Sequence, residues 1–441
     1  MAMGELSVSR RGLLGGLTAT AALGALSACD GDTVVENPPP VYAPLDPNSW
    51  DSVRRQFLLD TAKAQFAAFV FASPPTDVRT AISRHREGLD RDTVGYLHSQ
   101  EENARQRLHL AAGKYLGGSG DHVYFTDSTT MGLGLLYGGI ALRPGDEVLT
   151  TEHDFYSTHE SLRLRAARDG VTVRRVRLFA EPATASADQI AQAVAKSLTP
   201  ATRIVAVTWV HSSTGLRMPI RAIADVLAAH NRDLPPEKRA LLCVDGVHGF
   251  GAVDAGPAEL GCDFLVSGCH KWLFGPRGTG MVWGRPEAWA RFRPAIPTFE
   301  QAGFAHWLGF DPALPAPSAS PGGYHNFEHL WALEQAFDFH AALTRARVAA
   351  RTTELATRLK EGLAAIDGVE LITPKAAELS AGLVCCELKS MSPAAAVSVL
   401  AAKDIITSTT PYNPSYLRFG TSIVTNEADV DRALAAVREI S

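Results

Sequence analysis

The chain has 441 residues, of which 46% are hydrophobic, and its formal net charge is −5. This length is enough for two or three globular domains, and the composition is that of a globular protein. The charge is only mildly acidic and no basic stripe alternates with aromatic residues, so nucleic acid and an anionic membrane surface are excluded as expected partners.

The first 29 residues are predicted to be an export signal rather than part of the fold. Arg10 and Arg11 form a twin-arginine start, and the apolar run 13–26 is too short and too weakly hydrophobic for a dedicated membrane-spanning helix. The run ends at Cys29 in Leu-Ser-Ala-Cys, which resembles the lipobox of bacterial lipoproteins. We expect export by the twin-arginine route to the periplasm, with a lipid on Cys29 as the only membrane anchor. The alternative is cleavage nearby with Cys29 unmodified.

Residues 30–50 are proline-rich and polar, which predicts an extended tether, and residues 51–75 are predicted to form an N-terminal arm with a helix. Apart from Cys29, the cysteines are odd in number and lack paired spacing, so neither a disulfide framework nor a metal site is expected. They are interpreted as small buried hydrophobes: Cys243, Cys262, Cys269, Cys385 and Cys386.

Short apolar runs alternate with helical patterns from residue 76 to residue 320. The runs predicted as strands are 122–126, 146–151, 171–179, 203–210, 240–246, 262–268 and 280–284. The helices predicted between them are 129–142, 156–170, 187–198 and 220–231. Such alternation predicts an α/β fold: a large domain with a mostly parallel, doubly wound sheet covered by helices on both faces.

A Pro-, Ala- and Ser-rich stretch at 311–323 interrupts this pattern, and one long helical segment, 327–366, follows it. Three short strands come next, at 369–374, 382–388 and 416–420. Residues 321–441 are therefore predicted to form a linking helix and a smaller C-terminal α+β domain.

Polar residues follow several of the predicted strands, and ligands of open α/β sheets bind at the carboxyl ends of strands. Thr129 and Thr130 lie at a helix start after the first strand, where they could bind a phosphate, although a plain helix cap explains the same residues. Asp245 ends another strand. Its carboxylate could pair with a protonated ring nitrogen or cap the next turn.

The third such position is the segment 267–271, Ser-Gly-Cys-His-Lys. A lysine amine is a useful nucleophile only if it loses its proton easily, and burial beside cationic groups favours the neutral form. Ser267 and His270 can donate hydrogen bonds to a phosphate beside the amine of Lys271; the alternative is an ordinary surface lysine before a turn. An anion site, a carboxylate for a ring nitrogen and an amine for an aldehyde together describe pyridoxal 5′-phosphate (PLP).

From about Val53 to the C-terminus the chain resembles the class V aminotransferase family of fold type I PLP enzymes. The resemblance implies that Lys271 is the Schiff-base lysine, that Asp245 pairs with the pyridinium nitrogen, and that Arg418 binds a substrate α-carboxylate. It also implies that His153 or Phe155 stacks on the cofactor ring. The other implied cofactor contacts are His248 at the ring hydroxyl, Ser212 near the imine, Ser267, His270, Thr129 and Thr130 at the phosphate, and Thr279 at the phosphate of a neighbouring subunit in a homodimer.

The chain departs from the cysteine desulfurases of this family in one loop. Residues 406–414 carry no cysteine, where desulfurases have a nucleophilic cysteine shortly before the carboxylate-binding arginine. The motifs at 212–215 and 269–272 resemble instead the isopenicillin N epimerase-like branch. Exported members of that branch include periplasmic enzymes that modify the glutamate residue of pyoverdine siderophores.

The expected function is therefore an exported PLP enzyme with transaminase-like chemistry at the Cα of an amino acid or a peptidyl glutamate. One alternative is a lyase or epimerase acting on a sulfur-containing amino acid or peptide. Another is a non-catalytic, lipid-tethered binding protein. The aromatic residues of 304–310 could line a substrate entrance, but a core or dimer contact is favoured. His325 and His329 lie four apart, but without a third ligand nearby no metal is predicted.

Overall fold

The structure is a computed structural model that describes residues 44–310 and 320–441. The predicted signal and most of the predicted tether lie outside these ranges. The helices are α1 (Trp50–Arg54), α2 (Thr76–Arg91), α3 (Thr93–Leu116), α4 (Thr129–Gly139), α5 (Tyr156–Asp169), α6 (Ala187–Ser197), α7 (Ile220–Asn231), α8 (Pro257–Leu260), α9 (Pro286–Trp289), α10 (Gln301–Trp307), α11 (Phe327–Trp331), α12 (Leu333–Leu343), α13 (Arg345–Ala364), α14 (Pro393–Ala401) and α15 (Glu427–Ile440). Within the described ranges, no helix has the length and apolar composition needed to cross a bilayer.

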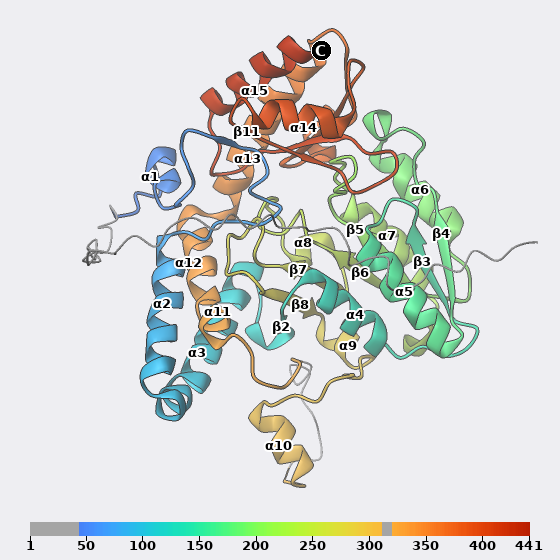
Figure 1. The fold of residues 1–441 in the computed structure, drawn as a ribbon. Coiled ribbons are helices and arrows are strands. Elements are labelled where there is room, and N and C mark those ends of the chain that lie inside the picture. The colour runs from blue at the N-terminus through green and yellow to red at the C-terminus, as the bar shows by residue number, and fades with distance from the viewer. Residues whose placement is uncertain (1–43, 311–319) are drawn as a thin grey trace, which may run out of the picture. The chain divides into compact units, whose positions relative to one another are not determined.

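A seven-stranded sheet with the order β2-β8-β7-β6-β5-β3-β4 forms the large domain (Figure 1). Its strands are β2 (Val123–Thr126), β3 (Glu147–Thr151), β4 (Thr172–Val176), β5 (Thr202–Thr208), β6 (Leu241–Asp245), β7 (Phe264–Gly268) and β8 (Gly280–Gly284). All neighbours pair in parallel except β8, which is antiparallel to both β2 and β7. The predicted α/β fold with a mostly parallel sheet is confirmed.

Both faces of this sheet are buried, which explains why its central strands are almost continuously apolar. In β5, Val205 and Val207 pack into one hydrophobic cluster with helices α6 and α7, whereas Ile204 and Ala206 pack into another with α4 and α5. Successive side chains of a strand point to opposite faces, so one apolar run serves both layers. On the second face α4 lies very close to β7, because a Cβ added at Gly132 would come within 2.7 Å of Val266.

A second, antiparallel sheet with the order β12-β13-β10-β9 forms the smaller C-terminal domain. Its strands are β9 (Val369–Leu371), β10 (Leu383–Leu388), β12 (Ser408–Thr409) and β13 (Leu417–Gly420). They pack with α13, α14 and α15 around a separate core that includes Leu359 and Phe419. The N-terminal arm also contributes, because β1 (Ala64–Gln65) pairs in parallel with β11 (Ile405–Ile406).

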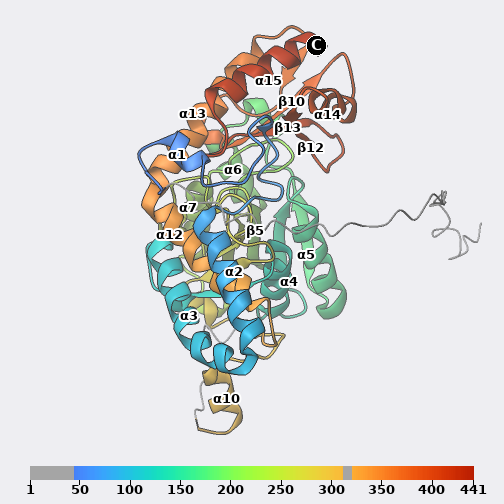
Figure 2. The same ribbon diagram turned by 60° about the vertical axis from the view of Figure 1, so that its left-hand side comes forward.

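The long helix predicted at 327–366 is wrong: the segment forms α11, α12 and α13. Thr344 separates the last two with a positive φ of 65°, a conformation outside the helical region. Its side-chain oxygen then accepts a hydrogen bond from the backbone N–H of Arg347, which caps the start of α13. The apolar periodicity continues across this residue, so the break cannot be read from the pattern. Figure 2 shows α12 beside α2 and α13 running on toward the small domain.

Candidate active site

The candidate site is assembled where β5, β6 and β7 end. Asp245, the last residue of β6, is in register with Thr208 of β5 and Val266 of β7. Because these strands are parallel, the segments that follow them emerge at one edge of the sheet. The sheet topology therefore brings Ser212, Asp245 and Lys271 to the same edge, although 59 residues of sequence span them.

Asp245 is a buried carboxylate with one oxygen satisfied and one free. Oδ1 accepts a hydrogen bond from the backbone N–H of Val247 at 3.0 Å, while the buried Oδ2 has no partner among the described residues. Burial is the main reason that the pKa of Asp245 rises to about 7, and the nearby carboxylate of Asp154 adds to the rise. An uncompensated buried oxygen of this kind fits a ligand that presents a cationic N–H, as a pyridinium does.

Lys271 follows β7 and is a largely enclosed amine. Burial and, after it, the positive charge of Arg418 lower its pKa to about 8, while Asp245 acts in the opposite direction. Its amine has no hydrogen-bond partner within the described part of the chain. Lys360 provides a contrast, because its pKa is also lowered to about 8 by burial but its amine donates to Pro374 O, Lys375 O and Ser380 Oγ. Of these two enclosed lysines, only Lys271 is free to bond a ligand.

An anion cradle lies at the start of α4, beside the last residue of β7. Ser128 caps this helix, and its side-chain oxygen accepts a hydrogen bond from Met131 N at 3.2 Å. A Cβ added at Gly268 would lie 3.1 Å from the hydroxyl of Thr129 and 3.2 Å from the His270 ring, so these two groups flank the bare glycine. A hydroxyl, an imidazole and a helix N-terminus around one point suit a phosphate. Thr130 lies on the exposed side of the same turn.

Ser267 and Thr279, both predicted phosphate contacts, donate their hydroxyl hydrogen bonds to backbone carbonyls of the chain. The Ser267 hydroxyl donates to Gly268 O at 3.1 Å, and the Thr279 hydroxyl donates to Pro276 O at 2.6 Å. Thr279 is 1% exposed, so its side chain is not presented to a neighbouring subunit as the resemblance implied. Its carbonyl has a different role: it accepts a hydrogen bond from Nδ1 of His270 at 3.0 Å and fixes the ring beside the cradle.

His248 is a buried, neutral ring. Burial, followed by the charges of Lys271 and Arg418, keeps its pKa well below its usual value. Nδ1 accepts a hydrogen bond from the Trp272 indole at 3.1 Å. The neutral tautomer therefore carries its proton on Nε2, which makes that nitrogen a donor, as a contact to a ring hydroxyl oxygen requires.

Both candidates for stacking on the cofactor ring lie at the end of β3. The ring of His153 stacks on Phe179, with centroids 3.9 Å apart and planes 9° apart, and the His211 ring lies 5.8 Å from it. Phe155 caps α5 and makes an edge contact with Tyr412, with centroids 5.9 Å apart. The structure brings both rings to the edge where the site forms, so the two alternatives remain open.

Arg418 reaches the site from β13 of the small domain. Its Nη1 donates to Ser212 O at 3.0 Å, its Nε donates to Ser408 Oγ at 3.1 Å, and the guanidinium lies 4.9 Å from the centroid of Phe69. Two hydrogen bonds and an aromatic face hold this cation in one orientation. The geometry suits a fixed carboxylate receptor placed near Lys271.

Tyr412 is a site residue that sequence reasoning missed. Its hydroxyl lies 2.8 Å from Ser212 Oγ, in the loop where desulfurases carry their cysteine. Burial is the main cause of a rise in its pKa, so it is a neutral phenol. A phenol that reaches a residue 200 positions earlier leaves no local pattern.

The comparisons with known proteins agree with this geometry. A family model described as Aminotransferase class-V matches residues 85–432. Isopenicillin N epimerase of Amycolatopsis lactamdurans is 26% identical over 417 residues, which cover 89% of this chain and 99% of that protein. A probable cysteine desulfurase of Pseudomonas aeruginosa is 30% identical over 322 residues, covering 69% of this chain and 74% of that protein. Among solved structures, a C-DES mutant with glycine covalently linked to its PLP cofactor gives a TM-score of 0.78 at 21% identity, covering 88% and 99% of the two chains.

Fold and site together define a PLP-dependent enzyme of fold type I, and PLP is its cofactor. The chain belongs to the class V aminotransferase family. Its similarity to isopenicillin N epimerases supports membership of that branch. The predictions of family, fold and cofactor are thereby confirmed, whereas the individual roles of the site residues stay predictions.

Proposed function

We propose that this protein is an exported PLP-dependent enzyme that acts at the Cα of an amino acid or a peptidyl glutamate, with transaminase-like chemistry. The observation that carries the proposal is the enclosed amine of Lys271, which has no hydrogen-bond partner among the described residues and whose pKa is affected by the charges of both Arg418 and Asp245. A structural lysine would have its protons bound by acceptors, as Lys360 has.

Each residue of the site has a role in this chemistry. PLP, when bound, supplies a sink for the electron pair released at Cα. Asp245 holds a proton on the ring nitrogen, and Arg418 orients the substrate through its carboxylate. Lys271, with a pKa of about 8, can take a proton from Cα and return it elsewhere near neutral pH. His248 would donate a hydrogen bond from Nε2 to the hydroxyl of the cofactor ring and so fix the orientation of that ring.

A lyase or epimerase acting on a sulfur-containing substrate is the second candidate, and the similarity to isopenicillin N epimerases favours it. Against a desulfurase mechanism, the loop before Arg418 presents Tyr412 instead of a thiol. The loaded enzyme should be incubated in D₂O with glutamate, glutamyl peptides and cystine. A carbonyl product identified by mass supports transamination; deuterium at Cα of recovered substrate without a carbonyl product supports epimerisation; released sulfur supports a lyase.

Replacing Arg418 with alanine should raise KM about 10- to 100-fold, because a charge-assisted hydrogen bond to a carboxylate contributes about 1.5–3 kcal/mol. The visible band of the bound cofactor should remain, since Arg418 is assigned to the substrate. Ser408→Ala is the graded control: it removes only the Nε partner and leaves the contact to Ser212, so its KM should rise less. An unchanged KM in Arg418→Ala would remove this residue from substrate binding.

We propose further that the protein is exported through the twin-arginine route and tethered by a lipid on Cys29, which its sequence supports. Replacing Arg10 and Arg11 with lysine should leave the chain in the cytoplasm. Cys29→Ser should leave it exported but shift it from the membrane fraction to the soluble periplasmic fraction. Fractionation with immunoblotting measures both, and a Cys29→Ser protein that stays on membranes contradicts the anchor.

A homodimer is also proposed, and exposed apolar side chains around α10 support it. Trp307 is 78% exposed and Phe310 81% exposed, and α10 stands away from the sheet in both views (Figures 1 and 2). Light scattering should give twice the chain mass for the wild type and the single chain mass for Trp307→Asp with Phe310→Asp. A monomeric wild type would exclude the dimer.

A further inference from the structure

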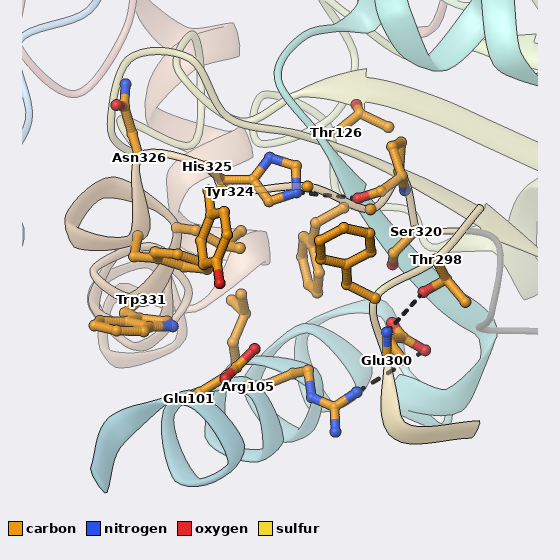
Figure 3. Close-up of a pocket in the computed structure, with 18 of the residues that line it drawn as sticks. Glu101, Arg105, Thr126, Thr298, Glu300, Ser320, Tyr324, His325, Asn326 and Trp331 are labelled. Atoms are coloured by element: carbon orange, nitrogen blue, oxygen red, sulfur yellow. Dashed lines mark hydrogen bonds and ion pairs between the residues drawn. The ribbon is translucent and has the colours of Figure 1, made fainter. Parts of the chain in front are cut away.

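A cavity of about 1050 Å³ lies beside the candidate active site and shares none of the residues assigned to cofactor or substrate. It is bounded by α3, by the end of β2 and by the segments 298–304 and 320–331 (Figure 3). A volume of this order accommodates a ligand larger than a single amino acid. The roles proposed for the residues around Lys271 do not involve this cavity.

Part of the cavity wall lies at the same edge of the sheet as the active site, because Thr126 lines it. β2 and β7 run in the same direction because β8 is antiparallel to both, so Thr126 at the end of β2 is level with the end of β7. Two strand spacings separate them, about 10 Å. Three extended residues span about 10 Å, so one short peptide could occupy both sites.

Negative charge dominates the cavity wall. The cavity is lined by four carboxylates, one guanidinium and three imidazoles: Glu101, Glu102, Asp127, Glu300, Arg105, His98, His109 and His325. Of these, Asp127 lies 3.9 Å from the ring of His325. Arg105 is already shared between Glu102 and Glu300, and the carboxylate of Glu101 has no hydrogen bond or ion pair among the described residues. Burial is the main cause of a rise in the pKa of Glu300, which Arg105 partly opposes. A cation would complement this wall.

Aromatic rings form the rest of the wall. Phe299 meets Phe304 at 5.8 Å and Tyr324 at 6.4 Å between centroids, and Phe327 stacks on Trp331 at 5.1 Å. Tyr324 is 81% exposed, so its face is available, and such faces attract cations. Trp331 is 2% exposed, yet its indole N–H has no hydrogen-bond partner in the described part of the chain, and its nitrogen edge faces the cavity in Figure 3. It offers a donor to an acceptor such as a peptide carbonyl.

We propose that this cavity binds the distal part of a peptidyl substrate, a basic side chain on an apolar or aromatic body. The excess of acidic residues favours a positively charged side chain, and the aromatic rings pack against its apolar part. The indole N–H of Trp331 donates a hydrogen bond to a peptide carbonyl of the ligand. The assignment of this ligand as substrate rests on the proposed function. The proposal that the cavity binds a cationic aromatic group does not depend on that function.

The binding site is tested with a probe that cannot react with the cofactor. Calorimetry on the cofactor-loaded protein should show binding of benzyltrimethylammonium and none of 3-phenylpropionate. Glu101→Gln should weaken that binding about five-fold, as expected for one exposed charge. The control Glu87→Gln, an exposed acid on α2 outside the cavity, should not. Equal binding of both probes, or no effect of Glu101→Gln, overturns the site.

The link to the substrate is tested separately. The dependence of the cofactor's visible spectrum on Glu-Gly-Arg-amide and Glu-Gly-Glu-amide should show the arginine peptide acting at a concentration about ten-fold lower, and Glu101→Gln should reduce this preference. An equal response to both peptides overturns the link. If neither peptide changes the spectrum although the protein binds benzyltrimethylammonium, the proposed reaction is contradicted and the binding site stands. If Tyr324→Asp converts a dimer to a monomer and the wild type binds no probe, a second copy fills the cavity and the proposal fails.

Discussion

Lys271→Ala is expected to reduce turnover by at least about 10³-fold, the range lost with an essential general acid–base group. Lys271 is predicted to hold PLP as a Schiff base, so loss of the amine should also remove the borohydride-sensitive visible band of the purified protein. The physical reason is the isolation of this amine: it is enclosed, its pKa is lowered to about 8, and no acceptor within the described residues binds its protons. Spectra and initial rates measure both effects.

Lys360→Met is the matched control, because it removes an amine with a similarly lowered pKa from another part of the chain. Its three acceptors lie in the loop between β9 and β10, so the variant should lose stability but keep the visible band. A colour that survives in Lys271→Ala and vanishes in Lys360→Met would mean that the wrong lysine has been assigned.

The fold could be predicted because its signals are local. A buried parallel strand is a continuous apolar run, and the residue that follows it is automatically at the sheet edge, which is how Asp245 and Lys271 could be placed together from sequence. The break at Thr344 could not be predicted, because a single positive φ does not disturb the apolar periodicity on either side. Nor could the β1–β11 pairing, since two-residue strands have no pattern.

The sequence allowed the residue types of the candidate site to be predicted, but not the contacts that each side chain makes. Thr279 was placed at a subunit boundary by motif, yet its hydroxyl bonds Pro276 O inside its own chain. Tyr412 and Ser212 meet across two domains, and only the folded chain shows it. Chemistry-bearing residue types stand out in a sequence, whereas the direction of each side chain depends on neighbours far away.

Buried groups of the same type separate into structural and functional ones by how fully they are satisfied. Asp154 and Asp245 are both buried acids near the ends of β3 and β6, the two strands that flank β5. Asp154 accepts hydrogen bonds from Thr150 Oγ1, Thr151 N, Thr151 Oγ1 and Thr208 N. Asp245 accepts one, and its Oδ2 has no hydrogen-bond partner among the residues that the structure describes. Since an unsatisfied buried group costs stability, its presence indicates a ligand that satisfies it.

Asp245→Asn should therefore have opposite effects on activity and on the stability of the cofactor-free protein. Turnover should fall about 10²- to 10³-fold, the loss typical of one electrostatic stabiliser of a transition state, because an amide does not hold a proton on the ring nitrogen. Without cofactor, the wild-type carboxyl has a folded pKa of about 7 against 3.8 unfolded. The folded state thus holds a proton that the unfolded state has lost between these pH values, and stability falls as pH rises through that window.

Asparagine carries no such penalty, so at pH 8 the cofactor-free variant should be more stable than wild type by up to about 4 kcal/mol, and the difference should vanish near pH 4. Urea unfolding of both proteins across this pH range measures it. Asp154→Asn should instead be destabilised at pH 8, since its four donors lose their carboxylate. A wild type whose cofactor-free stability does not depend on Asp245 between pH 4 and pH 8 would show that this carboxylate is already compensated, and the pyridinium assignment would lose its physical basis.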